Sequence, residues 1–209
     1  MIKSLYKKFF LIIFMLASLA NCVHKGSVEA VRPTNIYSDN DKKIQGNFVY
    51  VVDKTSLSKL KRDDTVQGFL CGAHNYPVDG TEAFNSSLPH MLEQVFEKIT
   101  RVNEGSAKPN TVQLLFRVER FEPRLRFSQK FFGADADGNV ELSVSVTGTK
   151  DGVRIFGTTV DTQRNKHGDG GPFCAEGTQV LADGVRDSIK DVLEKLGERM
   201  ANSQSLRKH

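Results

Sequence analysis

Several features that would define a class of protein are missing from this 209-residue sequence. Its 17 glycines and 6 prolines follow no three-residue period, which excludes a collagen-like chain. No apolar run approaches the roughly 20 residues that a membrane-spanning helix needs, which excludes a polytopic membrane protein. What remains, 39% hydrophobic and 26% charged residues, is the composition of an ordinary folded domain.

A strong charge of one sign is also missing. The formal net charge is +4, and three of the basic residues, Lys3, Lys7 and Lys8, lie in residues 1–21, where there is no acidic residue. The remaining 188 residues therefore carry a net charge of only +1. Such a chain has no broad positive field to attract nucleic acid, so we expect no nucleic-acid partner.

The common catalytic and cofactor motifs are absent: G-x-S-x-G, H-E-x-x-H, G-x-x-x-x-G-K and G-x-G-x-x-G. Ser56-Leu57-Ser58-Lys59 does match the S-x-x-K pattern of penicillin-binding enzymes. The match recurs at once in Ser58-Lys59-Leu60-Lys61, and the other elements those enzymes need are missing. We therefore interpret it as a solvated loop, and expect neither a cofactor nor an enzyme.

Two polar stretches have alternative interpretations. The carboxylates of Asp135–Glu141 invite a calcium loop, but the twelfth position of that loop would be Val146, which has no carboxylate. We expect a hairpin turn there, and no metal site. In the glycine-rich stretch Asn165–Gly171, His167 and Asp169 form a candidate acid/base pair. The alternative is a flexible loop that leads into a helix.

Residues 1–21 have the three parts of a secretory signal peptide. A basic segment with three lysines precedes the apolar run Phe9–Leu16, and the small-residue stretch Ala17–Ala20 follows it. From Phe9 to Ala20 the apolar run is about 12 residues long, too short to cross a bilayer. A cleaved signal peptide is therefore favoured over a retained transmembrane helix.

The next residues, Leu19-Ala20-Asn21-Cys22, resemble the lipobox of bacterial lipoproteins, although Asn21 departs from the usual Gly, Ala or Ser. The resemblance implies that the sulfur of Cys22 takes a diacylglycerol and that its amine is acylated after cleavage. Two or three acyl chains give effectively permanent membrane attachment. Because Asp does not follow the cysteine, the resemblance implies the outer membrane with the domain in the periplasm; inner-membrane anchoring stays open.

Two further cysteines, Cys71 and Cys174, remain once Cys22 is acylated. No C-x-x-C or Cys/His cluster suggests that they bind metal or catalyse a reaction. In an oxidising periplasm an even pair favours a disulfide, which would close a loop of about 100 residues; free buried thiols are the alternative.

The polar residues 22–45 predict a flexible tether, residues 46–201 the folded domain, and residues 202–209 a disordered tail. Asp151-Gly152 predicts a two-residue hairpin turn, and residues 56–62 are either a helical turn or an edge segment. Short apolar or alternating runs predict β-strands at 48–52, 66–71, 112–118, 125–131, 140–147 and 153–161.

Apolar stripes at helical spacing predict helices within residues 81–100 and 175–201. Pro89 limits the regular part of the first helix to residues from about Ser87 onward. Asp191 and Lys195 are spaced to form an ion pair on the second. The order β(β)-α-β-β-β-β-α predicts a single α+β domain, a mainly antiparallel sheet with both helices on one face.

Four arginines, Arg117, Arg120, Arg124 and Arg126, interleave with aromatic residues along one β segment. They are either a contact surface for a protein or glycan, or a solvated sheet face. By its order of elements alone, the domain is similar to small α+β envelope accessory lipoproteins that assist transport, secretion or cell-wall synthesis. This resemblance implies a non-catalytic protein that binds an envelope partner or forms a homo-oligomer. The alternative is a periplasmic hydrolase or ligand-binding lipoprotein that uses His167 and Asp169.

Overall fold

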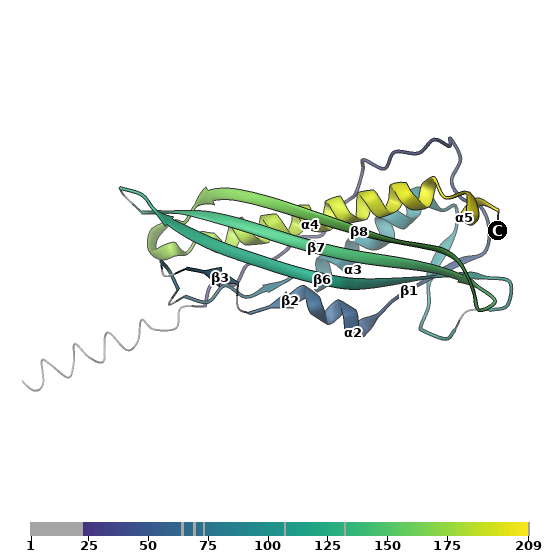
Figure 1. Ribbon diagram of the computed structural model, residues 1–209, viewed down its shortest axis with the longest axis horizontal. Helices are drawn as coiled ribbons and strands as arrows, with labels where there is room; N and C mark the ends of the chain where they lie inside the picture. The colour runs from purple at the N-terminus through teal and green to yellow at the C-terminus, as the bar shows by residue number, and fades with distance from the viewer. Residues whose placement is uncertain are drawn as a thin grey trace, which may run out of the picture.

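The computed structural model describes residues 23–208 except 64, 69, 73, 107 and 132 (Figure 1). The predicted signal peptide and Cys22 lie outside the described residues. Among the helices of the described part, none has both the length and the apolar character needed to cross a bilayer.

Three long antiparallel strands dominate the sheet (Figure 1). They are β6 (Val112–Gln129), β7 (Ala134–Lys150) and β8 (Val153–Asp169). As predicted, the residues Asp151 and Gly152 form the turn between β7 and β8, both with positive φ. The meander brings residues from the whole middle of the chain into one twisted layer.

Shorter strands complete the sheet beside β6. The first strand lies parallel to β6 on one side and parallel to β5 on the other, so the order is β5-β1-β6-β7-β8. A fragment, β3, pairs with β6 near its other end, and β2 pairs with β4 separately. The bounds are β1 Phe48–Val52, β2 Lys61–Arg62, β3 Val66–Gln67, β4 Val78–Asp79 and β5 Ile99–Arg101.

Both long helices, α3 (Thr81–Val95) and α4 (Gly177–Ala201), pack on one face of this sheet (Figure 1). The α+β class and the placement of the helices on one face are thus confirmed. The apolar stripes of the helices meet the inward residues of the strands in one continuous core. The short elements are α2 Lys54–Leu57, a 3-10 turn at Ser58–Leu60, a second at Pro172–Cys174, and α5 Gln204–Arg207.

A β-bulge in β6 explains why its second half reads irregularly in the sequence. The register with β7 shifts between Val118 and Arg120, which leaves Glu119 as the extra residue. Before the bulge the even positions are buried, and after it Phe121, Leu125 and Phe127 are buried instead. The two predicted strands at 112–118 and 125–131 are therefore one strand whose phase changes once.

The hairpin turn predicted at 135–141 and the flexible loop considered at 165–171 were both wrong, because the two stretches lie largely within long strands. Residues 135–141 belong to β7, and the turn before it is closed by Lys130, whose amide donates to the Gly133 carbonyl at 3.2 Å. Glycine occurs within these strands because α4 approaches closely. A Cβ at Gly138 would lie 3.3 Å from the Val180 carbonyl oxygen, and one at Gly168 would lie 2.7 Å from a Val180 methyl.

The first long helix also differs from its prediction. It begins at Thr81, so Pro89 is its ninth residue, although proline costs about 3 kcal/mol inside a helix. Its fully buried residues, among them Phe84 and Leu88 on either side of the expected start, favour the longer helix. Ile99, which fits the helical stripe, instead lies in β5 opposite Phe48.

The terminal segments differ from the expected tether and tail because both have contacts with the domain. In residues 23–45, which we call the N-terminal segment, the amides of Thr34 and Asn35 each donate to Glu194 of α4 at 3.0 Å. At the end of the segment Ile44 is buried in a bridge with Phe96. At the other terminus α5 forms and its Leu206 is fully buried.

Candidate functional site

The predicted arginine surface lies on the face of the sheet opposite the helices. In a regular strand Arg117 and Arg120 would point to opposite faces, because they are three residues apart. The bulge at Glu119 reverses the phase, so Arg117, Arg120, Arg124 and Arg126 all alternate with buried residues on the helix side. The structure therefore gathers the four arginines on one uncovered face, which we call the open face.

Acidic residues on neighbouring strands neutralise much of this surface. Glu141 of β7 lies between two arginines, 3.5 Å from Arg120 and 3.6 Å from Arg124. Arg120 also lies 3.7 Å from Asp161 of β8, and Arg124 lies 2.5 Å from Glu122. These pairs join all three long strands across the open face, with the arginines about half exposed. The role of Glu141 cannot be recognised in the sequence, because strand register is needed to place it between the arginines.

The outer arginines have different surroundings. Arg117 lies 3.2 Å from Asp53, which also accepts the Ser56 amide at 2.8 Å. The Ser56 amide and the Arg117 guanidinium hold the pKa of Asp53 below its ordinary value, against the effect of burial. Arg126 is exposed and forms no ion pair with any residue that the structure describes. It is the arginine of the open face whose charge is available to a partner.

The S-x-x-K match has a structural role. Ser56 is buried in α2 rather than solvated, which corrects the sequence interpretation. Its hydroxyl donates to the Asp53 carbonyl at 3.0 Å and accepts the Val118 amide of β6 at 3.1 Å. Lys59, the lysine of the motif, donates to the Glu119 carbonyl at the bulge. These side chains cover the edge of β6 where no strand pairs with it.

The edge of the sheet at β8 is long, and β8 pairs with no strand other than β7 within the described residues. Its side chains on the helix side are fixed to α4. Asp191 accepts from Thr162 and lies 2.5 Å from Arg164 and 3.0 Å from Lys195, the predicted partner on the same helix. Although burial opposes it, these donors hold the pKa of Asp191 below its ordinary value. Side chains cover part of the outer side of this 17-residue strand, since Arg199 donates to the Thr159 carbonyl at 3.1 Å, while no described strand pairs with it there.

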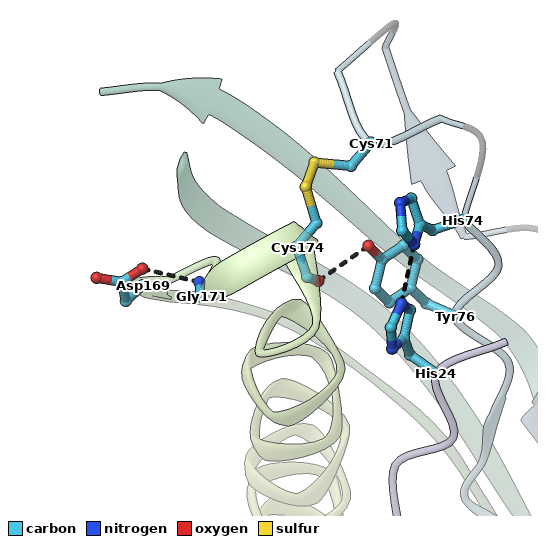
Figure 2. The surroundings of a disulfide bond; sticks show 7 residues. All are labelled: His24, Cys71, His74, Tyr76, Asp169, Gly171 and Cys174. Carbon is cyan, nitrogen blue, oxygen red and sulfur yellow. Dashed lines mark hydrogen bonds between the residues drawn. A yellow bond between two sulfur atoms is a disulfide. The ribbon is translucent and has the colours of Figure 1, made fainter. Parts of the chain in front are cut away.

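The structure does not bring His167 and Asp169 together as an acid/base pair. The Nδ1 of His167 lies 2.6 Å from Asp137, and its Nε2 lies 3.6 Å from Asp135. Hydrogen bonding to Asp137 raises the pKa of His167, which stabilises its charged form. Asp169 instead accepts the Gly171 amide at 2.8 Å, at the start of the turn before α4 (Figure 2). With both ring nitrogens facing carboxylates, His167 forms a link between β7 and β8.

Cys71 and Cys174 are bonded, as predicted, at the end of the domain where α4 begins (Figure 2). Beside the bond, the Tyr76 hydroxyl donates to the Cys174 carbonyl at 2.9 Å. The His24 ring stacks on His74 and Tyr76, with centroids 5.1 Å and 5.2 Å apart. No local sequence pattern shows that His24 and His74, 50 positions apart, will stack. We call this region the disulfide end.

Groups of three or more metal-ligating side chains are absent from the described part of the chain. The polar clusters that do form consist of carboxylates matched to arginine, lysine or histidine. Their chemistry is that of ion pairing across strands, and they can recognise a charged or hydrogen-bonding surface.

Comparison with known proteins assigns no family. No protein-family model matches the sequence, and no curated protein matches it. Among solved structures, a Xanthomonas campestris protein of the DUF330 family has a TM-score of 0.45 and 13% identity over 85% of this chain and 94% of its own. A minor lipoprotein from Acinetobacter baumannii has a TM-score of 0.43 and 13% identity over 76% and 92%. At these values the similarities assign neither a family nor a function.

Proposed function

We propose that this chain is a lipid-anchored lipoprotein of the bacterial outer membrane. Its periplasmic α+β domain binds another envelope protein and catalyses no reaction. The lipobox-like segment ending at Cys22 supports the anchor, and the disulfide supports an oxidising compartment. The open face supports the binding role.

One observation carries the binding role: the long helices and the N-terminal segment pack on the side of the sheet opposite the open face. Three long strands present their polar side there, bordered by the unpaired edge of β8. A wide surface with matched charges and an edge open to backbone hydrogen bonds suits a protein partner better than a small substrate. The rival hydrolase is less well supported, because His167 is already occupied by two carboxylates.

The binding role is tested at Arg126. Reversal of an ion-paired arginine such as Arg120 would disturb the sheet itself, whereas Arg126→Glu changes only an exposed charge. Cells that produce the full-length protein are treated with a cross-linker, and the membrane-bound complexes are purified. We expect Arg126→Glu to reduce the yield of the specific cross-linked species.

The matched control is Arg32→Glu, which makes the same change of charge in the N-terminal segment, on the opposite side of the domain. It should leave cross-linking unchanged. Equal yields from both variants would refute the open face as the binding surface. The anchor is tested separately: Cys22→Ser should abolish labelling by radioactive palmitate, and continued labelling would refute acylation at that residue.

A further inference from the structure

The domain begins directly after the proposed acylation site. Val23, the next residue, already forms a bridge with Asn75, and the His24 amide donates to the Asn75 carbonyl at 2.8 Å. The His24 ring then contacts His74 at 2.9 Å beside the disulfide (Figure 2). No spacer therefore separates the anchor from the folded domain. A lipid on Cys22 would bring the disulfide end to the membrane surface.

Exposed apolar side chains gather at the same end. The described chain leaves five large hydrophobic side chains exposed, and three of them, Val23, Leu70 and Phe131, belong to this end. Leu70 precedes the bonded Cys71, and Phe131 is at the tip of the turn that joins β6 to β7. Figure 1 shows this tip, β3 and the start of α4 at one end of the elongated molecule.

Phe131 is the most exposed of these residues, at 94%. The ion pair between Lys130 and Asp135 neutralises the charges at the base of the tip. An aromatic ring held in this way on a narrow projecting turn is able to enter the boundary between lipid headgroups and acyl chains.

We infer that the disulfide end rests on the lipid bilayer and that Phe131 inserts into its interface. The domain then stands on the membrane with its long strands rising from the surface. This inference rests on the proposed acylation of Cys22, which supplies the membrane. The insertion of Phe131 adds a second contact that fixes the orientation of the domain.

The absence of tryptophan from the chain gives a direct test. Phe131→Trp places a single fluorophore at the tip, and Val153→Trp places one at the other end of the sheet, where Val153 is also exposed, at 66%. Each full-length variant, purified from the membranes of the cells that produce it, is reconstituted into vesicles of phosphatidylethanolamine and phosphatidylglycerol, with and without brominated lipid. We expect the emission of Trp at 131 to shift to shorter wavelength and to be quenched by the brominated lipid. The control at 153 should show neither change.

Equal emission and quenching at the two sites would overturn the inference. Phe131 would then be exposed for contact with a protein and not with lipid. Flotation of the vesicles separates this failure from failure of the anchor: a protein that does not float refutes acylation at Cys22, and the membrane orientation with it. Arg126→Glu separates the two proposals, because it should reduce cross-linking on the open face and leave flotation and the quenching of Trp at 131 unchanged.

Discussion

Removal of the Cys71–Cys174 bond tests how far this bond, rather than the core alone, maintains the fold. The two cysteines are 103 residues apart, and the closed loop includes α3 and the three long strands. In the chain-entropy model a loop of this length contributes about 4.7 kcal/mol, and measured effects are often smaller. We therefore expect Cys71→Ser/Cys174→Ser to lower the free energy of unfolding by about 2–4 kcal/mol.

The measurement is urea unfolding of the full-length protein, followed by far-ultraviolet circular dichroism. The double variant leaves no free thiol in the domain, and the wild-type protein with reductant serves as the matched control, since it should unfold at the same urea concentration as the variant. Intact mass before and after reduction should differ by about 2 Da, one hydrogen per thiol. A loss below about 1 kcal/mol would refute the idea that the bond restricts the unfolded chain.

Three further predictions follow from local geometry. Gly177→Ala should cost about 1–3 kcal/mol in urea unfolding, because the added Cβ would lie 2.4 Å from the Phe127 ring; an unchanged midpoint would contradict this. Ser56→Ala should cost about 1–3 kcal/mol, since the buried Val118 amide loses its acceptor, and wild-type stability would count against a structural serine. Burial and a neighbouring imidazole lower the pKa of His24, so the stability it contributes is present above about pH 6.5 and is lost as the pH falls. Nuclear magnetic resonance titration should place its midpoint below that of a model histidine, and a midpoint at or above it would exclude the stacked arrangement.

The sequence predicts the layers of this fold better than the details of its strands. Hydrophobic periodicity identified both long helices and most of the sheet, because each buries one face. Gly138 and Gly168 misled the prediction, since a glycine that makes room for a helix looks the same in sequence as one that forms a turn. The extra residue at Glu119 likewise shows only in the pairing of two strands.

The sequence predicts the residue types of the candidate site, but not the ion pairs that join them. The four arginines were recognised as one group, but their common face depends on the bulge, and their acidic partners come from β7, β8 and the end of β1. The cluster of His24, His74 and Tyr76 depends on tertiary packing between distant segments. Such contacts have no local periodicity, and sequence patterns therefore do not show them.

The N-terminal segment would make the molecule longer if it were released from the domain. It starts at the disulfide end with Val23 and finishes at Ile44, shortly before β1 enters the sheet. Its 23 residues, pulled straight, would span at most about 80 Å. With Cys22 acylated as proposed, a load between the membrane and the domain would act first on contacts of the N-terminal segment such as the hydrogen bonds to Glu194. Release of the segment would therefore lengthen the connection between the proposed anchor and β1.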